Sequence, residues 1–225
     1  MTYSRDERRA LCAALDEAGP DAPTLCDGWA TRDLAAHLVL REHRPDAAAG
    51  MLGGPLAKHT QRVQQGIAGR TPYPRLVQTV RDGPPRLSLF GLPGVDARAN
   101  LVEYFVHHED VRRGAPGWEP RELDSGLTEM LWSRLGMTRL ILRRVPVGIE
   151  FARDDVPDGD GDGDGAGSSA RRHRMTIKTA TPVVTVIGPP AELTLWAMGR
   201  TGAARVRLDG TESAIQKVTS ANWRL

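Results

Sequence analysis

Three residues of this chain are of types that bind metal ions, and their spacing allows them to meet in a folded protein. Glu103 and His107 stand four residues apart between Asn100 and Asp110. Four residues is just over one helical turn, so both side chains point the same way if this segment is helical. If a second helix carrying His37 lies alongside, two imidazoles and one carboxylate converge and leave coordination positions open. That arrangement is typical of a catalytic rather than a structural metal site.

The other histidines do not fit this arrangement. His43 falls on a different helical face from His37, and His108 is rotated by about 100° from its neighbour His107 on a helix. His59 lies in a polar stretch and His173 in an arginine cluster. We therefore interpret His43, His59 and His173 as exposed.

Each of these features also has a purely structural interpretation. His37 stands between Leu34 and Leu38 and could be a buried histidine of the core. Glu103 and His107 could form an ordinary contact between helical residues four apart. Short motifs of this kind occur by chance, so more specific features are needed to decide.

Composition and charge limit the class of protein. The chain has 225 residues, a net charge of +2 with basic and acidic residues interspersed, and no long apolar run. Its first residues are polar and do not resemble a signal peptide. We therefore expect a cytoplasmic protein that binds neither a membrane nor nucleic acid. Its oligomeric state stays open.

The usage of basic residues and cysteine adds two observations. All 30 basic residues except Lys58, Lys178 and Lys217 are arginine, which is typical of a GC-rich genome and hints at an actinobacterial source. Cys12 and Cys26 are too few for a disulfide framework. We interpret both as small buried hydrophobic residues.

The first 145 residues predict helices. Ser4 and Glu7 are spaced as a capping box at the start of the first helix. The best-formed pattern runs from Asp96 to Arg113, with a basic last turn and a glycine stop. Apolar spacing and Pro or Gly breaks predict further helices beginning near Thr31 or Asp33, at Pro55, near Thr71 and at Asp124, the last of them extending to Arg144.

The remainder changes character. Alternating or β-branched residues predict strands at 147–152, 174–178, 183–187 and 206–208, and helices are expected at 191–198 and 212–218. We therefore expect an α+β protein, with a four-helix bundle over 1–145 followed by a small α+β domain over 146–225. The Asp/Gly-rich stretch at 157–170 predicts a flexible loop. It does not fit a calcium loop, because serine stands at position 169 where the closing acid belongs.

Three stretches resemble a known family. The sequence from Cys26 to Leu38, which contains Gly-Trp-x-x-x-Asp-x-x-x-His-Leu, resembles the start of the second helix in the DinB-like metal-binding superfamily, in particular its mycothiol-dependent maleylpyruvate isomerase branch. A second hallmark of that branch, Glu-x-x-x-His-x-x-Asp, stands here at 103–110. The stretch 187–200 resembles the small sterol-carrier-like domain that follows the bundle in these proteins.

The resemblance implies a site and an activity. His37, Glu103 and His107 match the metal ligands, Asp110 matches an outer residue that orients His107 or forms a buried ion pair, and Arg200 matches an arginine suited to a substrate carboxylate. Two imidazoles and a carboxylate favour Zn²⁺, although Ni²⁺, Fe²⁺ or Mn²⁺ suits the same ligands. The implied chemistry is attack of a metal-bound thiolate, that of mycothiol, on a small electrophilic molecule, by an isomerase or an S-transferase.

Two other functions remain open. A zinc-dependent hydrolase would use metal-bound water and needs a general base, for which Asp33, Glu109 and Asp110 are the options. A non-catalytic protein would bind a small apolar ligand and keep a structural metal. The Arg200 match also has a structural alternative, an arginine at a helix end that binds backbone carbonyls. The segment from Gly50 to Pro93 does not follow the isomerase branch, so maleylpyruvate itself is in doubt as the substrate.

Overall fold

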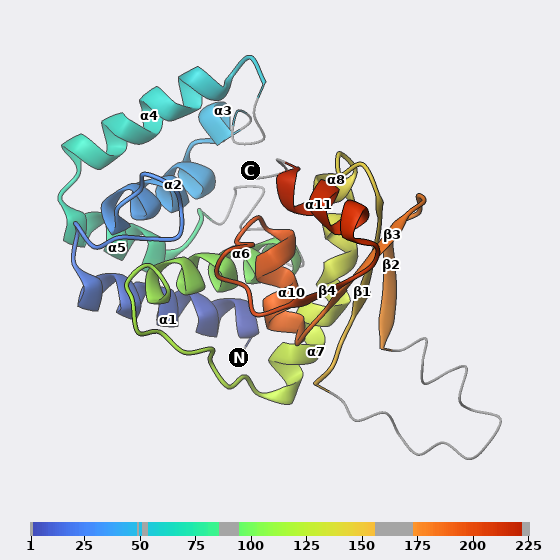
Figure 1. Cartoon of the computed structure of the whole chain (residues 1–225). Helices are drawn as coiled ribbons and strands as arrows, with labels where there is room; N and C mark the ends of the chain where they lie inside the picture. The colour runs from blue at the N-terminus through green and yellow to red at the C-terminus, as the bar shows by residue number, and fades with distance from the viewer. Residues whose placement is uncertain (1, 49, 51–53, 86–94, 156–172, 222–225) are drawn as a thin grey trace. The chain divides into compact units, whose positions relative to one another are not determined.

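A computed structural model describes residues 2–48, 50, 54–85, 95–155 and 173–221, which form two compact units, Met1–Glu122 and Leu123–Leu225. The first unit is helical and the second combines a small sheet with helices, so the expected α+β class is confirmed (Figure 1). The units divide near residue 122, whereas the sequence predicted a boundary after 145. The reason is that Leu135 and Leu142 are buried in the core of the second unit.

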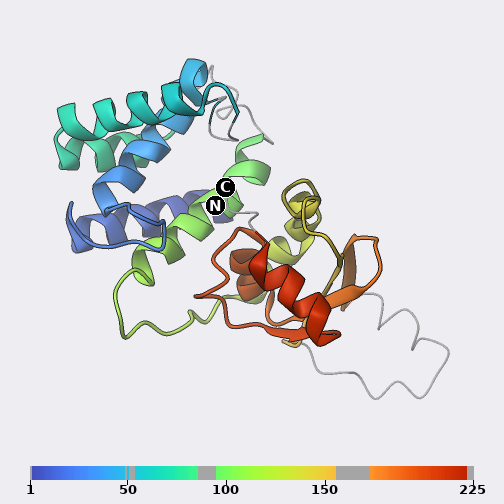
Figure 2. The same cartoon turned by 45° about the horizontal axis from the view of Figure 1, so that its top comes forward.

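The first unit is built from helices around one hydrophobic core. Figures 1 and 2 show α2 (Thr31–His43) lying between α1 (Tyr3–Ala18) and α4 (Ala57–Arg70). Leu11 and Leu15 of the first helix and Leu34 and Leu38 of the second are fully buried in this core. The described elements are α1 (Tyr3–Ala18), α2 (Thr31–His43), α3 (Pro45–Ala48), α4 (Ala57–Arg70), α5 (Tyr73–Asp82) and α6 (Val95–Arg112).

The start of α1 differs from the predicted capping box. The helix begins at Tyr3, with Thr2 as the N-cap, and Ser4 lies buried inside the first turn. Glu7 does not reach back to the helix start, because its carboxylate is drawn to His108 and Arg121.

A network of buried charges ties α1 to α6 and to the segment after it. The two Nη atoms of Arg121 donate to the two carboxylate oxygens of Glu7, each over 3.0 Å, and its Nε donates to Glu109 over 2.6 Å. Arg113 donates to the other oxygen of Glu109, also over 2.6 Å. Burial raises the pKa of Glu7 and Glu109, but these cations outweigh burial, so the pKa of both carboxyls lies below its usual value. Both carboxylates are therefore charged, and each is paired.

The second unit begins with an interrupted helix. The helix expected from 124 to 144 is split into α7 (Ser125–Arg134), the 3₁₀ turn η3 (Leu135–Thr138) and α8 (Arg139–Leu142). The hydroxyl of Thr138 donates to the carbonyl of Leu135 over 2.6 Å, a local bond that competes with the regular helical pattern.

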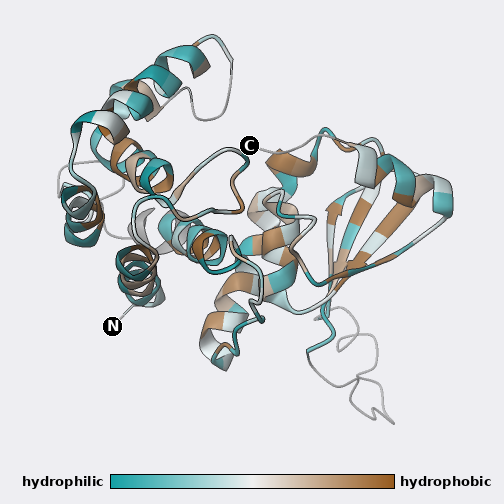
Figure 3. Ribbon diagram, turned by 60° about the vertical axis from the view of Figure 1, so that its left-hand side comes forward, coloured by the Kyte–Doolittle hydropathy of each residue, from teal (hydrophilic) through white to brown (hydrophobic). Residues whose placement is uncertain are grey.

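The sheet of the second unit has one covered and one polar face. Its strands β1 (Gly148–Ala152), β2 (Arg174–Lys178), β3 (Val183–Ile187) and β4 (Arg207–Asp209) lie in the order β2-β1-β3-β4, and only β1 and β3 are parallel. Phe151 and Val186 are buried in the core that these strands share with α10 (Pro190–Ala197), where Trp196 stands edge-on to Phe151. Figure 3 shows apolar and polar residues alternating along the strands. The final helix, α11 (Glu212–Ser220), contacts β3. The predicted loop at 157–170 falls outside the described residues.

One buried acid of the first unit is only partly satisfied. Glu42 of α2 is 1% exposed and accepts a hydrogen bond from the hydroxyl of Tyr104 over 2.6 Å. Its second carboxylate oxygen, Oε2, is buried and has no hydrogen-bond partner among the described residues. Burial therefore raises the pKa of Glu42 to about 7.

The raised pKa of Glu42 predicts a pH-dependent loss of stability. The unfolded chain releases the Glu42 proton at a lower pH than the folded protein, so the cost of burying the charge appears as pH rises from the ordinary value toward 7. The free energy of unfolding of Glu42→Gln, relative to that of wild type, should therefore increase between pH 5 and pH 8. The increase is at most about 3 kcal/mol, at about 1.4 kcal/mol per pKa unit. Urea unfolding in the presence of a chelator at both pH values measures this gain. The exposed Glu17→Gln should show no such growth, and an equal gain at pH 5 and pH 8 would contradict the assignment.

The buried charge network predicts a large cost for removing Arg121. Arg121→Ala leaves two buried carboxylates short of their shared cation and should destabilise the protein by about 3 kcal/mol. The exposed pair of Arg81 and Asp16 offers a matched control. Arg81→Ala should cost less than about 1 kcal/mol in the same denaturation experiment. Equal costs for the two variants would show that the network does not stabilise the fold.

Candidate metal centre

The structure brings the three predicted ligand residues together. Glu103 and His107 lie one turn apart on α6, and His37 reaches them from α2. The Nε2 atoms of His37 and His107 lie 3.4 Å and 3.3 Å from the same carboxylate oxygen of Glu103. The ligand atoms of all three residues lie within 4.8 Å of one another.

These distances are those of long hydrogen bonds, and they also suit side chains that share a metal ion. A typical hydrogen bond from nitrogen to oxygen spans about 2.9 to 3.0 Å. Two ligands bound to zinc at about 2.0 to 2.1 Å in a tetrahedron are separated by about 3.4 Å, which follows from the bond length alone. The two contacts of Glu103, at 3.3 and 3.4 Å, match this separation. The donor set also fits zinc by its chemistry, since it combines two imidazoles with a carboxylate.

The charge state of two of these residues suits metal binding. Burial raises the pKa of Glu103, but Arg41 and the two imidazoles outweigh it and hold this pKa well below its usual range. Burial lowers the pKa of His37, which favours the neutral ring that a metal requires. Arg41 stands one turn after His37, with its Nε 3.4 Å from Glu103 and one Nη bonded to Asn100. The sequence reasoning missed Arg41, although its spacing from His37 places both on one helical face.

His107 is held at its other ring nitrogen. Its Nδ1 lies 2.8 Å from Asp110 Oδ2, and the carboxylate of Asp110 is fully buried. Asp110 raises the pKa of His107 well above its usual value, with help from Cys26 and Glu103 and against the effect of burial. With Nδ1 held by Asp110, Nε2 is the nitrogen of His107 that faces Glu103, and it would bind a metal after losing its own proton. Asp110 therefore lies where an orienting residue for His107 was expected.

Cys26 belongs to this site, which sequence reasoning missed. Its thiol is half-buried and donates to Asp110 Oδ2 over 3.2 Å, the same oxygen that contacts His107. Cys26, His107 and Asp110 form a second group with metal-binding side chains. The 2.8 Å distance between His107 and Asp110 is that of a hydrogen bond, so we assign this second group as support for the first. Cys12 behaves as expected, because it is fully buried and burial raises the pKa of its thiol to about 11.

The loop between α1 and α2 links the two histidines. The backbone N–H of Leu25 donates to the carbonyl of Asp110 over 3.1 Å, and the Trp29 ring lies 5.0 Å from the His37 ring. The loop approaches the end of α6 so closely that a Cβ at Gly114 would lie 2.1 Å from the carbonyl oxygen of Pro23. Gly114, which follows α6, therefore leaves the space that the loop occupies, because it has no side chain.

The remaining histidines lie outside both groups among the described residues. His108 is buried and pairs with Glu7, on the other side of α6 from the metal residues. The other three are partly buried, not exposed as predicted: His43, His59 and His173.

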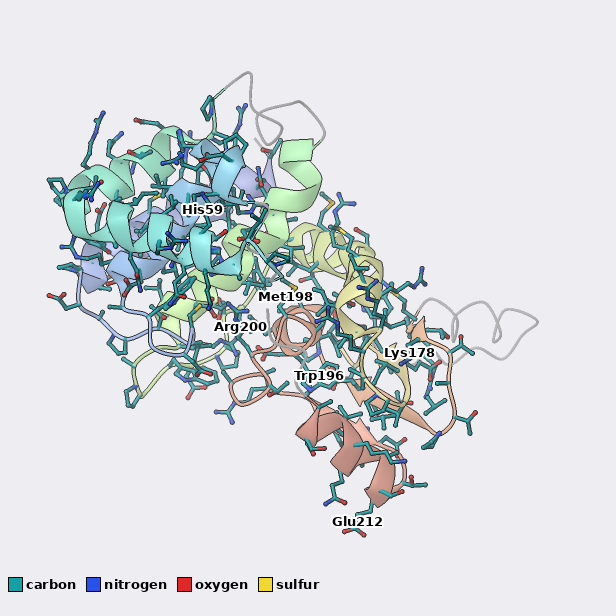
Figure 4. All side chains as sticks on the ribbon, turned by 90° about the horizontal axis from the view of Figure 1, so that it is seen from above. His59, Lys178, Trp196, Met198, Arg200 and Glu212 are labelled. Carbon is teal, nitrogen blue, oxygen red and sulfur yellow. The ribbon has the colours of Figure 1, made fainter. Side chains whose placement is uncertain are left out.

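Arg200 lies just after α10 in the second unit. One of its Nη atoms donates to the carbonyl of Met198 over 2.6 Å, and both residues are labelled in Figure 4. This contact is the one that its structural alternative, an arginine binding carbonyls at a helix end, anticipated. Its role toward a substrate stays a prediction.

The fold and the site define a class: a helical, DinB-like domain with a histidine and glutamate centre, followed by an α+β unit. Comparison with family models gives the particular family. Residues 2–86 match the Mycothiol maleylpyruvate isomerase N-terminal domain. The match supports the resemblance of the chain to the mycothiol-dependent branch. It also runs through most of the segment after Gly50 that the sequence reasoning had set apart from that branch. The match covers α1 to α5, including His37, and ends before α6.

The other comparisons add no relatives. No curated protein and no solved structure matches the chain. The resemblance of 187–200 to a sterol-carrier-like domain therefore stays a prediction. Among the described helices, none combines the length and the apolar character that crossing a bilayer requires.

The geometry predicts one divalent ion per chain. Purified protein incubated with Zn²⁺ and dialysed should retain one equivalent by elemental analysis, and His37→Ala and Glu103→Ala should each lose it. At a free Zn²⁺ concentration 100 times the dissociation constant, the ion should stabilise wild type by about 2.7 kcal/mol. His59→Ala removes an imidazole outside the centre and should keep the metal. Equal zinc retention in all four proteins would place the ion elsewhere.

Proposed function

We propose that this protein is a metal-dependent enzyme that uses a low-molecular-weight thiol, mycothiol, to isomerise or modify a small electrophilic molecule. The observation that carries the proposal is the convergence of His37 and His107 on one oxygen of Glu103, at distances that suit a shared ion. The family match of residues 2–86 supports the reaction class.

The chain's own residues would hold the ion and keep it reactive. His37, Glu103 and His107 would bind it, most favourably as Zn²⁺, and a bound ion supplies the Lewis acidity that lowers the pKa of a coordinated thiol. Glu103 stays ionised beside Arg41, and Asp110 keeps the Nδ1 proton on His107. With three protein ligands, positions remain for a thiol and a substrate atom.

The same geometry argues against the hydrolase alternative. Each carboxylate considered as a general base is engaged elsewhere. Asp33 accepts the backbone N–H of Ala30 at the start of α2, and Asp110 holds His107. Glu109 is fully buried and pairs with arginines. A thiol mechanism needs no general base of this kind, because a thiol coordinated to a bound ion would have a lowered pKa.

Turnover in the presence of mycothiol tests the proposal. Zinc-loaded protein should convert electrophiles such as maleylpyruvate or an activated aryl halide only when the thiol is added. An isomerase regenerates the thiol, whereas an S-transferase consumes one thiol per product, so thiol titration separates the two. The thiol-dependent rate should fall at least about 100-fold in Glu103→Ala and stay at the wild-type value in His59→Ala.

Two further results would change the assignment. Product formation from an ester or amide without thiol would favour the hydrolase, and metal binding without turnover would favour a ligand-binding protein. Arg200→Ala tests the proposed carboxylate contact: KM should rise for a carboxylate substrate and stay unchanged for a neutral one.

A further inference from the structure

We propose that Cys26 is a positioning residue of the metal centre, which acts on His107 through Asp110. The thiol donates to Asp110 Oδ2 over 3.2 Å, and His107 Nδ1 lies 2.8 Å from that same oxygen. One carboxylate oxygen of Asp110, Oδ2, therefore contacts both the Cys26 thiol and the His107 ring. The sequence gives Cys26 no such role, because 84 residues separate it from Asp110.

Because Asp110 is buried, its carboxylate needs hydrogen-bond donors from the protein. The carboxylate of Asp110 is fully buried, and the side chain of His107 is 8% exposed. A buried carboxylate without enough donors costs free energy or takes up a proton. The Cys26 thiol supplies a donor, while the Leu25 N–H fixes the backbone carbonyl of Asp110 over 3.1 Å. Side chain and backbone of one residue are thus held by two neighbouring residues of the loop.

The loop is itself shaped to present the thiol. The hydroxyl of Thr24 accepts the N–H of Cys26 over 3.2 Å and donates to the carbonyl of Trp29 over 2.8 Å. The ring of Trp29 then lies against His37, the other histidine of the centre. One short loop therefore touches the His37 ring through Trp29, and it reaches His107 both through Asp110 and by the Cys26 thiol beside the ring. Loss of the Cys26 donor should loosen Asp110, let the His107 ring turn, and weaken its metal bond.

Only the consequence for metal binding rests on the proposed function. The metal-free protein tests the positioning by itself, because Asp110 contacts Nδ1 of His107 without any ion. A hydrogen-bonded Nδ1–H in a buried site exchanges slowly with water and gives a downfield proton signal. In ¹⁵N-labelled protein this signal is assigned to His107 by its absence in His107→Gln.

The variants are chosen to separate positioning from general destabilisation. Cys26→Ala removes the donor, and Cys26→Ser retains one in the same place. Cys12→Ala removes the other thiol, which is fully buried and contacts the carbonyl of Val77. Stability, the His107 proton signal and Co²⁺ affinity, read from the visible absorption of bound Co²⁺, are measured for each protein.

We expect Cys26→Ala to lose or shift the His107 signal and to weaken Co²⁺ binding about tenfold, the lower end for residues behind a metal ligand. Cys26→Ser should restore the signal and bind within about threefold of wild type. Cys12→Ala should keep both readouts even if it is less stable. An unchanged His107 signal in Cys26→Ala, or the same change in Cys12→Ala, would overturn the inference whether or not the protein binds metal. Wild type that binds no Co²⁺ while its His107 signal responds to Cys26 would leave the positioning intact and refute the proposed function.

Discussion

The buried carboxylate of Asp110 is the constraint on which the rest of the site depends. It lies at the meeting point of α6 and the loop between α1 and α2, where it contacts His107 and accepts the Cys26 thiol. A charge in that position is tolerated only because donors surround it. The same donors fix the end of α6, the approach of the loop and the direction of the His107 ring. Local fold and site geometry are thus one hydrogen-bonded arrangement.

Charge pairing elsewhere in the first unit follows the same logic. Glu7 and Glu109 are buried against Arg121, and Glu103 lies beside Arg41. Each carboxylate is kept ionised by a cation placed within reach, although burial opposes it. Glu42 is the contrast, since burial outweighs its neighbours there and its pKa rises to about 7. Pairing of buried carboxylates, more than their burial, decides which of them carry charge.

The donor set explains how one centre serves several possible reactions. Two imidazoles and one carboxylate would leave a bound ion with residual positive charge, once His107 has lost its second ring proton. Whether such a centre activates a thiol or water depends on what else reaches it. The acids that would assist water, Asp33 and Glu109, are held by a helix start and by arginines. Among the described residues, none of the acids considered is placed as a free base, which agrees with the proposed thiol chemistry and with the family match of residues 2–86.

The sequence by itself determined the helical and mixed parts of the chain, the strand positions to within a residue, and the trio of His37, Glu103 and His107. These follow from local periodicity, from the spacing of Glu103 and His107 on one helix, and from motifs that resemble a family. The interruption of the 125–142 helix, the burial of Glu42 and the contacts of Cys26 and Arg41 were decided only in the tertiary structure. The reason is physical: Cys26 meets Asp110 across 84 residues. Such a contact depends on how the loop docks on α6, and no local pattern encodes that docking.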